Sequence, residues 1–171
     1  MIILLGIKHS GKTSLGELLA EALILPFKDL DILMEELYSE DRKYNIRELY
    51  LRLGERGFRS LETKAILKTN ITSDGILSLG GGTIDNPEAM AYVKKANLLV
   101  FLDAEEKTLF KRIKKNGFPS FLEKSPEILF HNLFQRRRDL YNNIADINLT
   151  IKDECPEEVL TILLKEIKER R

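Results

Sequence analysis

The first thirteen residues, MIILLGIKHSGKT, constrain the fold of this chain more than any other stretch. Residues 2–5 form a short apolar run, which predicts a strand buried on both faces. Gly6 lets the chain turn sharply after this run, and apolar residues recur at helical spacing from about Lys12 onward. The sequence therefore predicts a strand, a glycine turn and a helix in close succession.

The turn carries the pattern G-x-x-x-x-G-K-[ST], the phosphate-binding loop. Its glycines let backbone N–H groups curl around phosphate oxygens, and the following helix adds the positive end of its dipole. We expect Lys12 to reach the β- and γ-phosphates and the Thr13 hydroxyl to contact Mg²⁺. A turn with a chance lysine is the alternative, but the flanking strand and helix favour a nucleotide site. The predicted nucleotide-binding residues are Gly6, His9, Ser10, Gly11, Lys12, Thr13 and Ser14.

Length and composition restrict the classes of protein. A chain of 171 residues predicts a single domain, 1–171, and the 27 basic and 27 acidic residues give no charge bias toward nucleic acid or an anionic membrane. Cys155 is the only cysteine, so no intrachain disulfide forms, and we expect it to be buried or half-buried. No segment resembles a signal peptide or a membrane span. We expect a cytoplasmic, soluble monomer.

The rest of the chain alternates between short apolar runs and longer helical patterns, which predicts an α/β fold with a five-stranded parallel sheet flanked by helices. Strands are expected near residues 2–5, 27–29, 76–79, 98–102 and 147–151. Helices are expected from residue 12 onward and over 30–38, 46–53, 55–70, 87–95, 104–115, 126–143 and 156–171.

Two acidic residues follow the second predicted strand. Asp29 and Asp31 lie where a strand becomes a helix, at the sheet edge where ligands collect in parallel α/β folds. Acids at this edge can serve a metal and a hydroxylated substrate. Asp31 could equally well cap the helix, which aspartate does readily.

Further candidates lie in the middle of the chain. Arg59 and Glu62 are three residues apart and share one helical face, for which an exposed ion pair is the commoner explanation. Gly80, Gly81 and Gly82 follow a strand, and three successive glycines indicate that the backbone closely approaches something.

Two basic clusters occupy the second half. Lys111, Arg112, Lys114 and Lys115 form either a solvated face, which is the usual case, or a rim of charge near phosphates. Arg136, Arg137 and Arg138 are adjacent on a predicted helix, so at most one or two of them can face a given ligand.

In order and spacing, these elements together resemble shikimate kinase over nearly the whole chain. The residues that carry the resemblance are the phosphate loop, Asp29-Leu30-Asp31, Leu53-Gly54-Glu55 with Phe58-Arg59 and Glu62, Gly80-Gly81-Gly82, and Arg137 followed by Leu140-Tyr141. The resemblance implies a three-layer, P-loop fold like that of nucleoside-monophosphate kinases. It also implies a substrate-binding region at about 30–62 and a mobile lid at about 112–125.

The resemblance further implies transfer of the γ-phosphoryl group of ATP to the 3-hydroxyl of shikimate, in the biosynthesis of chorismate and aromatic amino acids. Lys12 and Asp31 would be catalytic, and Asp31 would hold ring hydroxyls and orient or deprotonate the attacking one. Arg59 and Arg137 would grip the substrate carboxylate, for which their planar charged forks are suited. Gly80, Gly81 and Gly82 would line the substrate, and Thr13 and Asp29 would act on Mg²⁺.

Two positions depart from the family pattern. His9 stands where the phosphate loop usually has another glycine, and Phe118 stands before Pro119 where the lid usually has an arginine. Lys114, Lys115 and Lys124 are candidates to replace that cation. A related small-molecule kinase, such as a gluconate kinase, is an alternative function. A nucleotide-binding regulatory protein that has lost most of its catalysis is another, and Phe118 is the residue that supports it.

Overall fold

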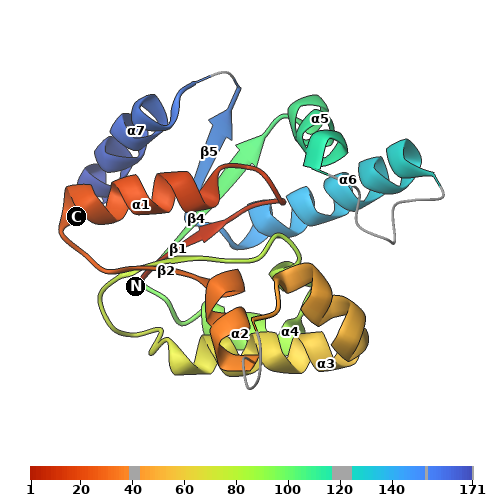
Figure 1. Cartoon of the computed structure of the whole chain (residues 1–171). Coiled ribbons are helices and arrows are strands. Elements are labelled where there is room, and N and C mark those ends of the chain that lie inside the picture. Colours follow the sequence, from red (N-terminus) through yellow and green to blue (C-terminus); the bar gives the residue numbers. More distant parts are fainter. Residues whose placement is uncertain (39–42, 117–124, 153, 171) are drawn as a thin grey trace.

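Five parallel strands form the centre of the computed structural model, which describes residues 1–38, 43–116, 125–152 and 154–170 (Figure 1). In sheet order β2-β3-β1-β4-β5, these strands are Phe27–Asp29, Ile76–Ser78, Ile2–Leu5, Leu98–Ala104 and Ile147–Ile151. The chain visits β2 and β3 on one side of β1 before it crosses to β4 and β5 on the other. Strand order therefore reverses beside β1, and a crevice forms at the carboxyl end of such a strand.

Burial along the strands follows their place in the sheet. Ile3, Leu4 and Leu5 of β1 are completely buried, as a central strand covered on both faces requires. In β5, at the edge, buried and exposed residues alternate. The predicted five-stranded parallel sheet is confirmed, and β4 continues two residues beyond its predicted end at Leu102.

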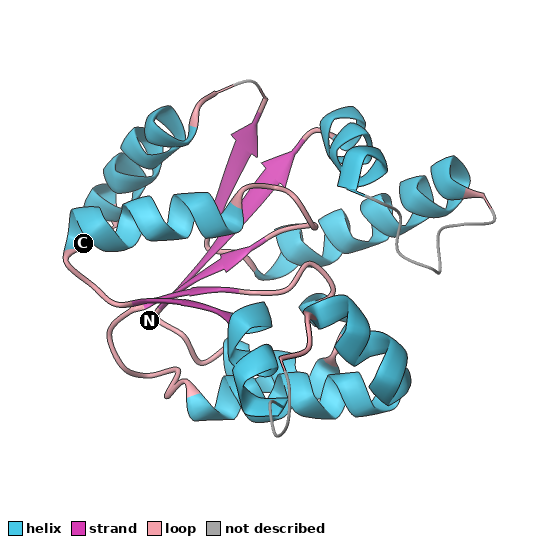
Figure 2. Ribbon diagram, in the orientation of Figure 1, coloured by secondary structure: helices cyan, strands magenta, loops and turns pink. Residues whose placement is uncertain are grey.

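Helices cover both faces of the sheet (Figure 2). Helices α1 (Lys12–Leu23) and α7 (Pro156–Glu169) lie side by side over one face. Helix α6 (Pro126–Ile144) runs behind β4 on the other face, and α5 (Glu106–Asn116) contacts α6.

A second group of helices lies below β2 in the view of Figure 1. It contains α2 (Leu30–Tyr38), α3 (Ile46–Lys68) and α4 (Pro87–Val93), with α3 in contact with both of the others. Asn45 caps α3 in a capping box with Glu48, as the sequence suggested for Asn45. Gly54, with φ 64° and ψ 176°, interrupts α3, so the two predicted helices meet in a kink at this residue.

The prediction that Cys155 is buried is wrong. It is exposed at the N-terminus of α7, where its side chain accepts a hydrogen bond from the backbone of Glu158. Cys155 is the N-cap residue of α7, and this end of the helix lies at the surface. The residue type alone did not indicate this position.

Some expectations lie outside the described residues, namely Phe118, Lys124 and residues 117–124 of the expected lid. Among the helices that the structure does describe, none combines the length and the apolar character that a membrane span needs.

Candidate functional site

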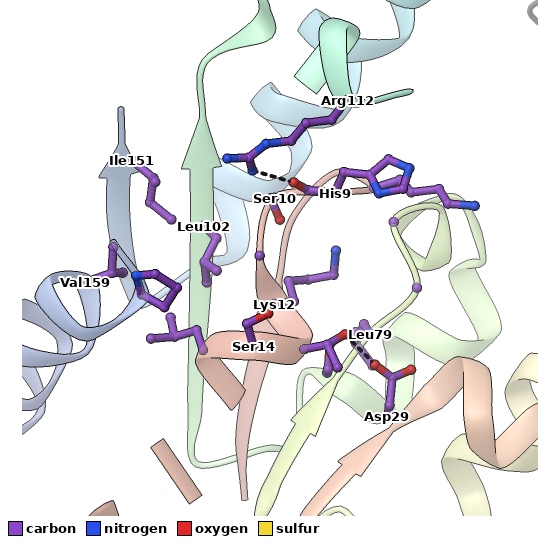
Figure 3. A pocket seen from close by; sticks show the side chains of 18 of the residues that line it. His9, Ser10, Lys12, Ser14, Asp29, Leu79, Leu102, Arg112, Ile151 and Val159 are labelled. Carbon is purple, nitrogen blue, oxygen red and sulfur yellow. Dashed lines mark hydrogen bonds between the residues drawn. The ribbon is translucent and has the colours of Figure 1, made fainter. Parts of the chain in front are cut away.

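The phosphate-loop motif lies between β1 and α1, at the carboxyl edge of the sheet (Figure 3). The Ser10 N–H donates to the Ile7 carbonyl at 3.1 Å, which tightens the loop. Gly11, the N-cap residue of α1, has φ 96°, in the left-handed region that favours glycine. The unpaired N–H groups of the first turn of α1 thus begin where the loop ends, which is the arrangement that binds phosphate.

His9 also adopts a left-handed conformation, with φ 68°. This geometry explains why glycine suits the position, since a side chain there costs about 1–2 kcal/mol. The loop keeps its shape with histidine, and the carbonyl of His9 accepts a hydrogen bond from Arg112 at 2.8 Å.

Lys12 is buried beneath the loop, with 8% of its surface exposed. Its ammonium donates to the carbonyls of Gly6 at 3.0 Å and Ile7 at 3.1 Å. Burial lowers the pKa of Lys12 to about 8, while the charge of Asp31 works in the opposite direction. At neutral pH the ammonium is mostly protonated and available to an anion.

Asp29 organises the acidic side of the site. Its carboxylate accepts hydrogen bonds from the Thr13 hydroxyl at 2.8 Å and from the Asp31 N–H at 2.9 Å. Asp29 therefore supplies the contact at the start of α2, and the carboxylate of Asp31 forms no hydrogen bond with the described residues. The alternative that Asp31 serves only as a helix cap is not supported.

The surroundings of Asp31 disfavour its charge. Burial raises the pKa of Asp31 to about 6, and the carboxylate of Asp29 contributes to the rise, whereas Lys12 and Lys8 oppose it. At pH 7 the group is mostly a carboxylate and can still accept a proton. This combination suits a general base.

Arg59 and Glu62 belong to a buried network and not to an exposed helical pair. The Glu62 side chain is 3% exposed, and it accepts from Arg59 at 3.1 Å. Its carboxylate also accepts from the Thr83 hydroxyl at 2.7 Å and the Asn86 amide at 2.8 Å. The Arg59 guanidinium donates further to the Gly82 carbonyl at 2.9 Å. These contacts fix the guanidinium beside the triple glycine.

The three adjacent arginines of α6 separate as the helical geometry predicts. Arg137 and Arg136 both reach Asp85, at 2.6 Å and 2.8 Å, and their side chains are 12% and 57% exposed. Arg138 turns away and pairs with Asp103 at 2.6 Å. Only Arg137 among them approaches the triple glycine, at 3.1 Å from where a Cβ on Gly82 would lie.

The triple glycine is the point at which the parts of the site meet. A Cβ on Gly80 would lie 3.0 Å from the Asp31 carboxylate, and a Cβ on Gly81 would lie 2.5 Å from the backbone nitrogen of Lys8. A Cβ on Gly82 would lie 3.1 Å and 3.5 Å from the guanidinium groups of Arg137 and Arg59. The expected close approach of this backbone is confirmed, because each glycine touches a different functional group.

A pocket of about 540 Å³ connects the phosphate loop with Asp31 (Figure 3). In Figure 3, Asp29 lies on one side of this pocket and Leu102, Ile151 and Val159 lie on the other. Its lining also includes Asp31, Gly80, Gly81, Arg112 and Pro156. Arg59, Gly82 and Arg137 do not line this pocket but adjoin it through Gly81. The predicted residues thus form two neighbouring parts of one site.

Sequence reasoning overlooked Lys8 and Asp85, and for Arg112 it left open a solvated face, the usual case, or a rim of charge near phosphates. Arg112 and Lys8 line the pocket. Of the candidate substitute cations, Lys114 and Lys115 do not line it, and Lys124 lies outside the described residues. The position of Lys8 inside the motif was a signal for its proximity. No comparable signal marked Asp85, whose contact with Arg137 joins residues 52 positions apart.

Comparison with known proteins agrees with this geometry. A family model described as "Shikimate kinase" matches residues 8–168. The shikimate kinase of Enterococcus faecalis is 31% identical over 171 residues, covering 98% of each chain.

Solved structures give the same result. The shikimate kinase of Aquifex aeolicus has a TM-score of 0.83 at 30% identity, over 99% of this chain and 96% of that one. A shikimate kinase from Acinetobacter baumannii, solved in complex with shikimate, has a TM-score of 0.89 at 24% identity, over 99% and 93% of the two chains. This likeness shows that the two chains share a fold, which is a P-loop fold like that of nucleoside-monophosphate kinases. The chain belongs to the shikimate kinase family.

Proposed function

We propose that this protein transfers the γ-phosphoryl group of ATP to the 3-hydroxyl of shikimate, which gives shikimate 3-phosphate and ADP. The observation that carries the proposal is the meeting of phosphate loop, Asp31 and two arginines at Gly80, Gly81 and Gly82. A phosphate donor and a hydroxylated carboxylic acid can then lie end to end. The reaction belongs to the biosynthesis of chorismate and aromatic amino acids.

The shape of the pocket gives ATP a direction. Its phosphates lie on residues 6–14, with Lys12 released from the Gly6 and Ile7 carbonyls to bind them. The nucleoside then extends toward the apolar end, where Arg112 and Pro156 line the pocket. The γ-phosphate faces the opposite end, beside Asp31.

The acceptor lies across the triple glycine from ATP. Arg59 and Arg137 bind its carboxylate, and Asp31 binds ring hydroxyls and accepts the proton of the attacking one. The hydroxyl oxygen forms a bond to the γ-phosphorus as the bond to the ADP oxygen breaks. Positioning supplies much of the rate, because both reactants are held in a fixed orientation.

Thr13 and Asp29 are the residues that would hold Mg²⁺. A hydroxyl and a carboxylate 2.8 Å apart offer the oxygen ligands that Mg²⁺ prefers. The described residues contain no group of three or more His, Cys, Asp or Glu able to hold a metal. Mg²⁺ typically takes one or two protein ligands and completes its shell with phosphates and water. When bound, the ion neutralises phosphate charge.

We propose that the enzyme works as a monomer on two small molecules, ATP and shikimate, without nucleic acid or a membrane as partner. Because ATP is a substrate, we place the enzyme in the cytoplasm. We propose that the lid expected at about 112–125 covers ATP. The structure describes the two ends of this segment, residues 112–116 and 125.

A coupled assay of ADP release tests the proposal. The purified protein is incubated with Mg²⁺ and ATP and with shikimate, gluconate or no acceptor. We expect ADP release that depends on shikimate, with formation of shikimate 3-phosphate seen by ³¹P NMR. Preference for gluconate would indicate a related sugar-acid kinase. Tight nucleotide binding without turnover on either acceptor would indicate a regulatory nucleotide-binding protein.

A further inference from the structure

The phosphate loop contains a second lysine, Lys8, in addition to the motif residue Lys12. Lys8 is exposed and lines the pocket with Asp31, Gly80 and Gly81. Its backbone packs directly on Gly81, where an added Cβ would lie 2.5 Å from the Lys8 nitrogen and 3.0 Å from its Cα. The residue is therefore fixed where the phosphate loop meets the acceptor side of the site.

The cations around the site differ in whether they already have an ion-pair or hydrogen-bond partner. Arg59 and Arg137 pair with Glu62 and Asp85, and the Lys12 ammonium donates to two carbonyls. Within the described parts of the chain, the Lys8 side chain forms neither an ion pair nor a hydrogen bond. An ammonium on a flexible four-carbon stem can thus turn toward an incoming anion without breaking an existing contact.

The charge of Lys8 acts on three neighbouring groups. The Lys8 ammonium opposes the rise that burial causes in the pKa of Asp31. Burial is the largest cause of the lowered pKa values of His9 and Lys12, and the Lys8 charge lowers both further. Asp31 belongs to the acceptor end, whereas His9 and Lys12 belong to the phosphate loop. The Lys8 charge thus acts on both sides of the junction where a γ-phosphate would lie.

We propose that Lys8 binds the γ-phosphoryl group of ATP and stabilises its charge during transfer. The proposal rests on the function proposed above. As the acceptor oxygen bonds to the γ-phosphorus, the bond to the bridging oxygen breaks and its electron pair remains on ADP. The acceptor proton passes to the Asp31 carboxylate, and Lys8 keeps its proton while its N–H groups contact a γ-phosphate oxygen. Lys8 thereby supplies a cation from the phosphate loop itself.

The test compares Lys8→Met and Lys8→Arg with Lys64→Met, which removes another exposed lysine, from α3 and outside the pocket. Steady-state kinetics give kcat and KM for both substrates. Calorimetry gives the affinity for ADP and for a non-hydrolysable ATP analogue, and thermal unfolding checks the fold.

We expect Lys8→Met to lower kcat by about 10- to 100-fold, since removal of one donor to a transition-state oxyanion typically costs 100-fold or more and this side chain is exposed. Affinity for the ATP analogue should fall several-fold, while affinity for ADP, which lacks the γ-phosphate, should change by less than about twofold. Lys8→Arg should restore part of kcat, and Lys64→Met should match the wild type.

Two results would overturn the proposal. Equal loss of affinity for ADP and the analogue, with kcat unchanged, would make Lys8 a general attractor of phosphate. Unchanged kinetics and binding would make it a solvated surface residue. The comparison of nucleotides needs no acceptor, so it tests Lys8 even if shikimate is not the substrate. A wild-type protein inactive on shikimate would contradict the proposed function alone.

Discussion

The guanidinium of Arg137 donates two hydrogen bonds to the carboxylate of Asp85, from Nε at 2.9 Å and from Nη2 at 2.6 Å. This contact uses one edge of the guanidinium and leaves the Nη1 edge for a second carboxylate. Arg136 approaches the other oxygen of Asp85 at 2.8 Å, so the acid is compensated by two positive charges. The cluster keeps a net positive charge while Arg137 is held in one orientation.

Replacing Asp85 should therefore weaken the binding of shikimate. Removing the acid also removes a negative charge near the substrate carboxylate, but Arg136 already offsets that charge. The loss of two charge-assisted hydrogen bonds that orient Arg137 is the larger effect. We expect Asp85→Ala to raise KM for shikimate by about tenfold, as the loss of about 1.4 kcal/mol predicts. KM for ATP should not change.

The control is Asp139→Ala, which removes an exposed carboxylate from the same helix as Arg137. Steady-state kinetics with shikimate varied decide the matter. A lower KM in Asp85→Ala would indicate that Asp85 competes with the substrate for Arg137.

The pKa of Asp31 predicts how activity depends on pH. Burial and the neighbouring charge of Asp29 raise this pKa to about 6. The carboxylate form is the one that accepts the hydroxyl proton, so kcat/KM for shikimate should fall about tenfold per unit below pH 6. It should be level between about pH 6 and pH 8 and fall again above that, where Lys12, with a pKa of about 8, loses the proton that binds phosphate. Asp31→Asn should have low activity without this acidic limb. An acidic limb that persists in Asp31→Asn would assign the titration to another group.

The sequence predicted the framework of the site because its signals are local. A motif of eight residues placed Lys12 and Thr13 on the first helix, and the triple glycine indicated a close approach. The groups that orient these residues come from elsewhere in the chain. Glu62 and Asn86 are 24 positions apart, and nothing in their spacing predicts a 2.8 Å contact.

The surroundings of Arg112 and Cys155 also depend on tertiary position. Arg112 is one of several cations on an amphipathic helix, and only the packing of α5 beside the phosphate loop selects it to contact His9. Cys155 is small and only weakly polar, which suggests burial, but its cap position places it at the surface.

Lys12→Met should remove phosphoryl transfer and leave the protein folded. The methylene stem fits a buried methionine, but no ammonium remains for the phosphates. We expect kcat to fall by about a hundredfold or more. The carbonyls of Gly6 and Ile7 lose a donor, so thermal unfolding at a slightly lower temperature is compatible with this prediction. Turnover close to that of the wild type would contradict the role assigned to the loop.

The contact between Gly81 and the phosphate loop predicts different effects for two neighbouring glycines. A Cβ on Gly81 would lie 2.5 Å from the backbone nitrogen of Lys8, whereas one on Gly80 would lie 3.0 Å and 3.2 Å from side-chain oxygens of Asp31 and Thr83. Backbone cannot move aside as a side chain can, so Gly81→Ala must displace the phosphate loop.

We expect Gly81→Ala to lower the free energy of unfolding by about 1–3 kcal/mol, the usual cost of overpacking, and to weaken the affinity for ADP. Gly80→Ala should lower kcat through Asp31 while it keeps the wild-type affinity for ADP, because the phosphate loop stays in place. Thermal unfolding and calorimetry with ADP on both variants measure the two effects. Equal affinity for ADP in both variants would show that the two loops move independently, and the close packing of Lys8 on Gly81 would then have no part in holding the nucleotide.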